Sequence, residues 1–116
     1  LHPLRVMLNV PTIEHKIVAV LPDVLEDTET STEDLRKLGF QQQIIDAVLA
    51  LTKKTGESRL QAAQRTVQNP IARVVKLADI ADNMDLSRIQ SPTIKDFERL
   101  KEYQQVRDIL LFQNVE

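Results

Sequence analysis

Hydrophobic residues recur at helical spacing along almost the whole chain, and no segment has a clear strand pattern. The stripes predict helices that begin near residues 4, 12, 31, 44, 60, 70 and 93. The predicted fold is therefore all-α, a compact orthogonal bundle of about six to seven helices. We expect it to form a single domain over residues 1–116.

Local signals mark where several of these helices begin and end. Thr12 can cap the second helix, and Ser31 opens the third, which Gly39 stops. The fourth helix is predicted to end near Gly56. Pro70 suits the first turn of the sixth helix, because its missing N–H has no partner there.

Two helices carry long apolar stripes that we expect to face the core. In the second helix the stripe consists of Ile13, Ile17, Val20, Leu21, Val24 and Leu25. In the last helix it consists of Ile94, Phe97, Leu100, Tyr103, Val106 and Leu110. The last helix, with Phe97 and Tyr103 and with Leu111 and Phe112 near its end, is also a candidate homodimer surface, although we favour packing on the core.

Composition narrows the classes of protein. The chain is 42% hydrophobic and 28% charged, which is typical of a globular domain. The net charge of −2 gives no indication of a DNA-binding surface, and no apolar run approaches the ~18 residues of a membrane span. The absence of cysteine excludes thiolate metal sites and fits the cytoplasm, where we expect the protein to act.

Two predicted helices end in the same way, with carboxylates late in the helix. The first set is Asp23, Glu26 and Asp27, and the second is Asp79, Asp82 and Asn83, each at positions i, i+3 and i+4. The helix dipole disfavours negative charge at this end by ~0.3–1 kcal/mol per residue. A bound cation, or a reaction that needs these acids, would explain the pattern.

The alternative is that both sets are solvated helix faces, which are common. The apolar neighbours weigh against it, because LPDVLED and VVKLADIADNM place Asp23 and Asp79 close to the core. An acid at the core boundary is rarely tolerated without a partner.

His2 is the natural third metal ligand, because imidazole with carboxylate oxygens suits manganese, iron or zinc. A histidine near a chain start is also commonly structural. His15 precedes Pro22 by about two helical turns, ~10 Å along the axis, so it is too far away to share a metal with Asp23 easily. We interpret His15 as half-buried or exposed.

Glu26 and Asp27 lie one turn beyond Asp23, where they could hold and deprotonate a water molecule. Basic side chains could meet phosphate oxygens, although most are expected to be solvated. The candidates are Lys53, Lys54, Arg73, Lys76 and Arg88.

Three segments carry a family resemblance. They are HPLRV at residues 2–6, AVLPDVLEDT at 19–28 and VKLADIADNM at 75–84. They resemble the H…HD…D pattern of HD-superfamily metal phosphohydrolases, above all the hydrolase domain of the RelA/SpoT-homologue enzymes and their small single-domain relatives. The resemblance covers nearly the whole chain in the family's order.

The resemblance implies a metal centre and a water-activating pair. It implies that His2, Asp23 and Asp79 bind Mn²⁺ or another divalent metal, and that Glu26 and Asp27 activate water. It also implies removal of the 3′-pyrophosphate of (p)ppGpp or of a related phosphorylated nucleotide.

The substrate contacts implied by the resemblance include Asn83, and we add Lys76 as a second candidate. The family has a helix before the HP motif that supplies basic residues to the nucleotide. Because the chain begins at Leu1-His2-Pro3, we expect it to lack this helix.

Pro22 departs from the family pattern. It stands where the family has the histidine of HD, and proline has no side-chain donor for a metal. Three of four protein ligands would remain. A proline in a helix interior also destabilises the helix by ~3 kcal/mol, and a kink could displace the neighbouring Asp23. We therefore expect the activity to be impaired.

Three hypotheses follow. The leading one is a metal-dependent pyrophosphohydrolase with reduced activity. The second is a catalytically inactive domain that binds a nucleotide as a regulator, and the third is a purely structural helical module.

Overall fold

The computed structural model describes residues 2–112, apart from the side chains of Glu26, Asp27 and Arg88. Within this part of the chain, every regular element is a helix, which confirms the all-α prediction. The helices are α1 (His2–Leu8), α2 (Ile13–Asp27), α3 (Thr32–Lys37), α4 (Gln42–Leu51), α5 (Arg59–Thr66), α6 (Pro70–Asn83), the short 3-10 helix η1 (Leu86–Arg88) and α7 (Ile94–Phe112).

The predicted helix starts are confirmed by their hydrogen bonds. The Thr12 side chain caps α2. Ser31 and Asp34 form a reciprocal capping box at the start of α3, with N–H···O distances of 2.9 and 3.2 Å. Pro70 is the first residue of α6, and the Asn69 side chain caps that helix. Local sequence signals therefore determine where these helices begin.

The fourth helix ends earlier than predicted. It stops at Leu51, whereas Gly56 lies in the following loop with a φ of +80°. Gly39 also has a positive φ, of +94°, and follows α3 as predicted. Gly56 therefore marks a turn in the α4–α5 loop and not the end of α4.

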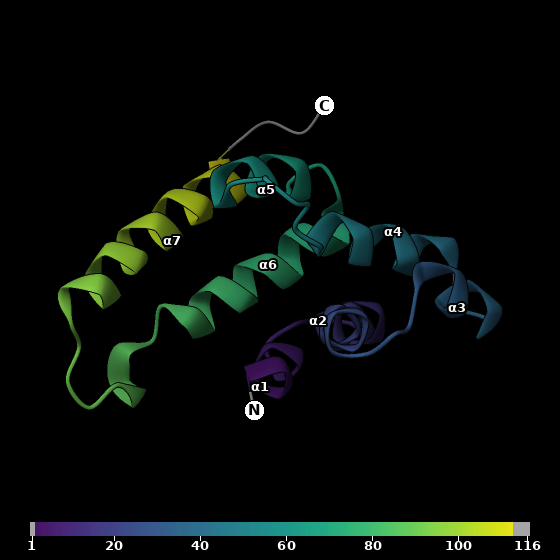
Figure 1. Cartoon of the computed structure of the whole chain (residues 1–116), viewed down its shortest axis with the longest axis horizontal. Coiled ribbons are helices and arrows are strands. Elements are labelled where there is room, and N and C mark those ends of the chain that lie inside the picture. The colour runs from purple at the N-terminus through teal and green to yellow at the C-terminus, as the bar shows by residue number, and fades with distance from the viewer. Residues whose placement is uncertain (1, 113–116) are drawn as a thin grey trace.

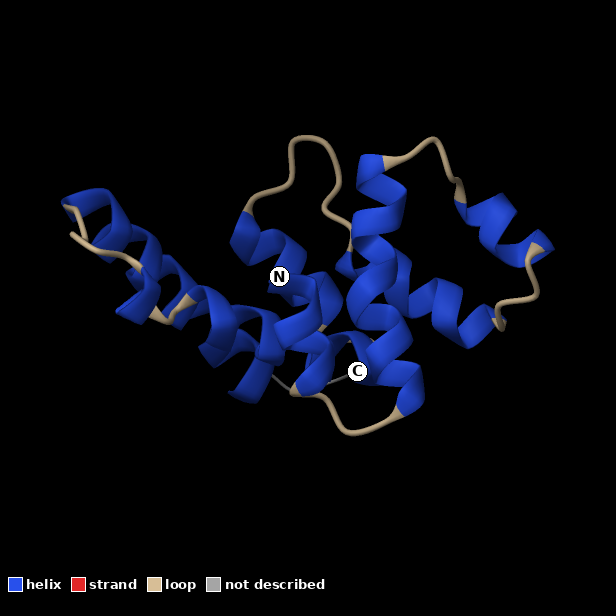
Figure 2. Ribbon diagram, turned by 90° about the horizontal axis from the view of Figure 1, so that it is seen from below, coloured by secondary structure: helices blue, strands red, loops and turns tan. Residues whose placement is uncertain are grey.

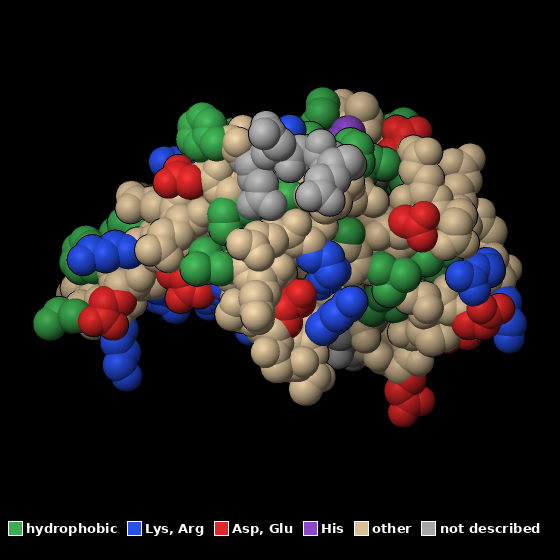
Figure 3. Space-filling view, turned by 90° about the horizontal axis from the view of Figure 1, so that it is seen from above, with side chains coloured by type: hydrophobic (Ala, Val, Ile, Leu, Met, Phe, Trp, Pro, Cys, Tyr) green, Lys and Arg blue, Asp and Glu red, His purple; other side chains and the backbone are tan. Residues whose placement is uncertain are grey.

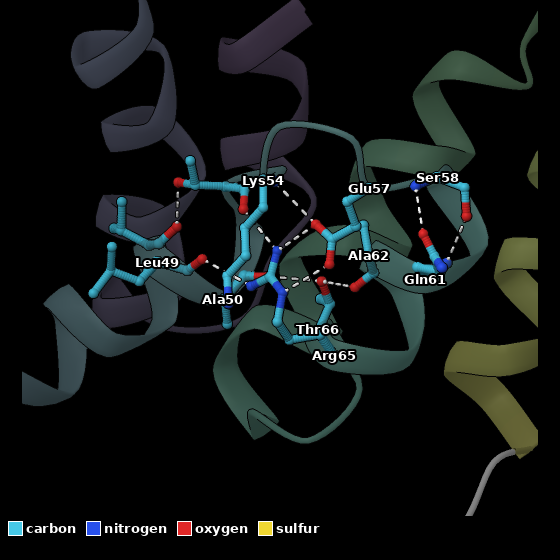
Figure 4. A network of polar contacts seen from close by, with 11 residues as sticks. Leu49, Ala50, Lys54, Glu57, Ser58, Gln61, Ala62, Arg65 and Thr66 are labelled. Carbon is cyan, nitrogen blue, oxygen red and sulfur yellow. Dashed lines mark hydrogen bonds and ion pairs between the residues drawn. The ribbon is translucent and has the colours of Figure 1, made fainter.

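A side chain from α5 satisfies the carbonyls at the C-terminal end of α4 (Figure 4). The Arg65 guanidinium donates to the backbone carbonyls of Leu49 (3.0 Å), Ala50 (3.2 Å) and Thr52 (2.7 Å). It also pairs with the Glu57 carboxylate at 2.9 Å. The last carbonyls of a helix lack intrahelical donors, and Arg65 supplies them from outside the helix.

The helix α2 continues through Pro22 to its end at Asp27. Burial is concentrated in its middle, where Val18 is 0% and Leu21 is 7% exposed. Two residues predicted to face the core do not: Ile13 is 72% and Val24 is 38% exposed. Leu25, at the C-terminal end of the stripe, is half-buried against the core, so only parts of the stripe are left without cover.

The prediction for α7 is only partly right. Val106 and Leu110 are buried, whereas Ile94 is 78% and Phe97 is 48% exposed. In Figure 1 the C-terminal half of α7 lies beside α5, while its N-terminal half extends away from α5. The apolar spacing is helical along all of α7, but neighbouring helices cover only part of it.

The bundle is orthogonal, as predicted. In Figure 1 the viewer looks along the axis of α2, while α4, α6 and α7 lie across the view. Figure 2 shows that the helices are joined by loops without strands in the described part of the chain. The helix α6 contacts α1, α2, α4, α5 and α7, and so lies at the centre of the molecule.

The core consists of two clusters that meet at α6. Val75 of α6 belongs to a larger cluster built with α1, α2, α3 and α4, and Ile80 belongs to a smaller one built with α5 and α7. Helix α6, which carries Asp79 and Asp82, therefore packs against both core clusters.

On the surface, acidic and basic side chains are interspersed over the face seen in Figure 3. None of the helices in residues 2–112 combines the length and apolar character needed to cross a membrane.

Candidate functional site

A cavity of about 210 Å³ lies between α1, α2 and α6. It brings together the side chains of His2, Asp23 and Asp79, which the sequence analysis singled out as metal ligands, and Pro22. Its walls are completed by Pro3, Val6, Ala19, Leu51, Val75 and Lys76. Candidate ligands that are far apart in the sequence thus share one hollow.

His2 lies between two carboxylates of α6. Its Nε2 is 2.6 Å from Oδ1 of Asp79, and its Nδ1 is in hydrogen-bond contact with Oδ2 of Asp82. Burial lowers the pKa of His2, but the hydrogen bonds and charges of Asp82 and Asp79 outweigh it, so the pKa of His2 is raised. The imidazole connects α1 to the acidic face of α6.

Asp79 is bonded on both carboxylate oxygens. Lys76 Nζ lies 2.8 Å from Oδ2, and Asn83 Nδ2 donates to Oδ1 over 3.4 Å. These partners stand three positions before and four positions after Asp79 on α6, so all three side chains share one helix face. The candidate substrate contacts Lys76 and Asn83 thus lie next to a candidate metal ligand.

Asp82 has a different environment. Its side chain is only 8% exposed, and its Oδ1 accepts a 2.8 Å hydrogen bond from Arg5 Nε. A buried carboxylate requires such partners. The sequence analysis grouped Asp82 with the acidic set but missed its pairing with His2 and Arg5. This pairing could have been predicted from HPLRV (residues 2–6) and LADIADN (residues 77–83) only if α1 and α6 were already known to be neighbours.

On α2, Asp23 is half-buried and lines the cavity next to Pro22. The candidate water-activating residues Glu26 and Asp27 occupy the last turn of α2, but their side chains lie outside the described part of the structure. Their roles stay predictions.

The residues around the cavity suit a divalent cation by the chemistry of their donors. One imidazole and two carboxylates offer nitrogen and oxygen ligands of the kind that Mn²⁺, Fe²⁺ and Zn²⁺ accept. Among the described side chains, no group of three or more His, Asp or Glu already has the arrangement of a metal site. His2 is instead hydrogen bonded directly to Asp79. Pro22 adds no donor to the set.

A second cavity, of about 240 Å³, is lined by Leu51 and Lys76, which also line the first. Its other walls are Lys53, Arg59, Ala62, Thr66, Ile80, Asn83, Tyr103 and Val106. The Arg59 guanidinium lies over the Tyr103 ring, 4.8 Å from its centroid. Arg59 and Tyr103 were not among the candidate site residues, because they come from α5 and α7 and their spacing is that of ordinary helices.

The basic candidates separate into two groups. Lys53 and Lys76 line the second cavity. Arg73 instead donates to the backbone carbonyls of Leu110 and Leu111, which fastens α6 to the end of α7. The phosphate role suggested for Arg73 is therefore replaced by a structural one.

Three other residues complete the comparison with the predictions. His15 is half-buried on α2 and contacts the Thr12 hydroxyl, as its position suggested. Lys54 is exposed. The side chain of Arg88 lies outside the described residues, so its suggested phosphate contact stays a prediction.

Comparison with known proteins agrees with the family resemblance. No family model matches the chain. The chain is 34% identical, over 92 residues, to the guanosine-3′,5′-bis(diphosphate) 3′-pyrophosphohydrolase MESH1 of Drosophila melanogaster, and the match covers 75% of this chain and 51% of that protein. The chain thus spans about half the length of this curated relative. The activity stated in the name of this relative is the one that the family resemblance implies.

Proposed function

We propose that this relative of the HD-type phosphohydrolases is a metal-dependent pyrophosphohydrolase of (p)ppGpp or a related phosphorylated nucleotide. The observation that carries the proposal is the shared cavity of His2, Asp23 and Asp79, which come from α1, α2 and α6. The similarity to a guanosine-3′,5′-bis(diphosphate) 3′-pyrophosphohydrolase supports the choice of substrate.

In this proposal His2, Asp23 and Asp79 hold the divalent ion, with Mn²⁺ as the first choice. When bound, such an ion supplies positive charge that polarises a phosphoryl oxygen and favours attack by water. Glu26 and Asp27 follow Asp23 by one helical turn. We assign them the positioning of water and the acceptance of its proton.

The second cavity is proposed to hold the remainder of the nucleotide. Lys53, Arg59 and Lys76 provide positive charge for phosphate oxygens, and Asn83 provides an amide for hydrogen bonding. The Tyr103 ring offers a surface on which a base can stack. Because Lys76 lines both cavities, one ligand could extend from the metal ligands to the basic wall.

Pro22 reduces the activity in this proposal. It lines the cavity where the family resemblance places a histidine ligand, and it contributes no donor atom. Metal affinity should therefore be the quantity most impaired.

The test is Mn²⁺-dependent release of pyrophosphate from ppGpp by the chain and by two matched variants, Pro22→His and Pro22→Ala. Both variants remove the proline, but only Pro22→His restores a possible ligand. We expect Pro22→His to exceed both others in kcat/KM at limiting Mn²⁺. Adding Asp79→Ala to Pro22→His should lower the activity at least about a hundredfold, since even outer partners of metal ligands contribute 10–100-fold. Absence of turnover in all variants at saturating Mn²⁺ would refute the proposal.

The second candidate function is a catalytically inactive nucleotide-binding regulatory domain. It is favoured by the position of Pro22 in the cavity wall beside an otherwise retained set of polar residues. It predicts that ppGpp binds to the chain without hydrolysis in any variant. Equilibrium binding of ppGpp to the chain and to Lys76→Ala, measured beside the hydrolysis assay, separates the two functions.

A further inference from the structure

The Asp82 carboxylate bridges two side chains of α1. Its Oδ2 contacts Nδ1 of His2, and its Oδ1 accepts from Nε of Arg5 at 2.8 Å. With 8% exposure, the Asp82 side chain is the most buried of the three, since His2 and Arg5 are each 36% exposed. Each oxygen of this carboxylate thus has its own donor.

Both nitrogens of His2 face a carboxylate, which only accepts hydrogen bonds: Nδ1 faces Asp82, and Nε2 lies 2.6 Å from Oδ1 of Asp79. The two carboxylates differ in place, because Asp79 lines the cavity of the candidate metal ligands and Asp82 does not. A metal ion in the cavity would therefore replace the proton on Nε2, while Nδ1 keeps its proton toward Asp82. Metal-binding histidines usually donate their second N–H to a carboxylate, which sets the tautomer and the orientation of the ring.

We propose that Asp82 and Arg5 are positioning residues that keep the proton of His2 on Nδ1 and present Nε2 to the metal ion. The inference rests on the proposed function, because it takes His2 as a metal ligand. Arg5 fixes the carboxylate, and the carboxylate fixes the imidazole. Neither Arg5 nor Asp82 is among the residues that line the cavity.

Replacing Asp82 by asparagine gives a sharp test because Arg5 dictates how the new amide is oriented. Arg5 Nε is a donor, so the amide oxygen must face Arg5 and the NH2 group must face His2. Nδ1 then has to accept, and the proton moves to Nε2, where it blocks metal binding. Asp82→Asn is nearly isosteric, and removing the arginine in Arg5→Leu/Asp82→Asn frees the amide to turn round.

The experiment records ¹⁵N spectra of the imidazoles at pH 9 without metal, and the Mn²⁺ affinity by titration calorimetry. The chain has only 2 histidines, so His15 serves as the internal reference. In the chain we expect a population of His2 with the proton on Nδ1, because the Asp82 carboxylate accepts there. In Asp82→Asn this population should disappear and the proton should lie on Nε2, and in the double variant it should partly return to Nδ1. Asp82→Asn should lower the Mn²⁺ affinity about 10–100-fold, both when introduced into the parent chain and when combined with Pro22→His. The exposed substitution Asp108→Asn on α7 is the control and should change neither quantity.

An unchanged tautomer in folded Asp82→Asn would overturn the inference while leaving the proposed function intact, provided that the chain or Pro22→His binds Mn²⁺. A changed tautomer with unchanged Mn²⁺ affinity would also overturn it. If neither the chain nor Pro22→His binds Mn²⁺, the metal-centred function fails and the role of His2 fails with it.

Discussion

At the scale of single residues, the acidic side chains of this protein differ in their surroundings and in their hydrogen-bond partners. Asp79 lines a cavity, whereas Asp82, three positions later on α6, is directed to Arg5 and His2. Spacing along a helix identifies which side chains share a face. It does not identify which of them meets a partner from another helix.

Glu57 is another acid whose behaviour depends on a distant partner. Hydrogen bonds from the Arg65 side chain and the Lys54 backbone lower the pKa of Glu57 to about 2, from an ordinary value near 4.5. A lowered pKa in the folded protein contributes stability above the unfolded value. That contribution is lost as the pH falls from about 4.5 through about 2.

We therefore expect Glu57→Gln to lower the melting temperature at pH 7. The difference from the parent chain should stay constant down to about pH 4.5 and shrink below it, since Glu57 becomes protonated in the unfolded chain there while it stays ionised in the folded protein until about pH 2. Thermal unfolding followed by circular dichroism between pH 3 and pH 7 measures this, with the exposed Glu98→Gln as control. A difference that grows toward low pH would contradict the assignment.

At the scale of elements, α2 is a helix that keeps a proline in its interior. Pro22 has no N–H to donate to Val18, one turn earlier, yet the helix continues to Asp27. Packing of Val18 and Leu21 in the core holds the helix together across this point. Helix α6 also contains a proline, Pro70, but at its first position, where no hydrogen bond is lost.

The two prolines make a matched pair of substitutions. We expect Pro22→Ala to raise the free energy of unfolding by about 1–3 kcal/mol, because it restores a backbone donor in a helix interior. Pro70→Ala should change it little, since proline suits the first helical turn. Urea denaturation of both variants gives the two values. A loss of stability in Pro22→Ala would show that the surrounding core is adapted to the proline.

At the scale of the whole molecule, the candidate metal ligands connect three helices. His2 belongs to α1, Asp23 to α2 and Asp79 to α6, and these helices share the larger of the two core clusters. An ion bound by all three would stabilise the folded protein, because the unfolded chain does not hold the ligands together.

Mn²⁺ should therefore raise the melting temperature. At a concentration of ~100 times the Kd, binding adds about 2.7 kcal/mol to the free energy of unfolding. We expect the largest shift in Pro22→His, a smaller one in the parent chain at the same Mn²⁺ concentration, and none in Asp79→Ala. Differential scanning fluorimetry across a Mn²⁺ series measures all three. Equal shifts in Asp79→Ala and the parent chain would place the ion elsewhere.

Much of the fold could be predicted because it depends on local chemistry. Thr12, Ser31 and Pro70 act within one turn of their own positions, so the sequence indicated these helix starts correctly. The exposure of Ile94 and Phe97 could not be predicted, since it depends on how far neighbouring helices reach along α7.

The sequence by itself determined the helices and the acidic ends of α2 and α6, because each follows from residue type and spacing. That Pro22 stands at a ligand position is what the family resemblance implies. Only the tertiary structure decided that His2, Asp23 and Asp79 line one cavity, and that Asp82 holds His2 together with Arg5. Those contacts join residues that lie as many as 80 positions apart. Their geometry follows from how α1, α2 and α6 pack, which no local pattern encodes.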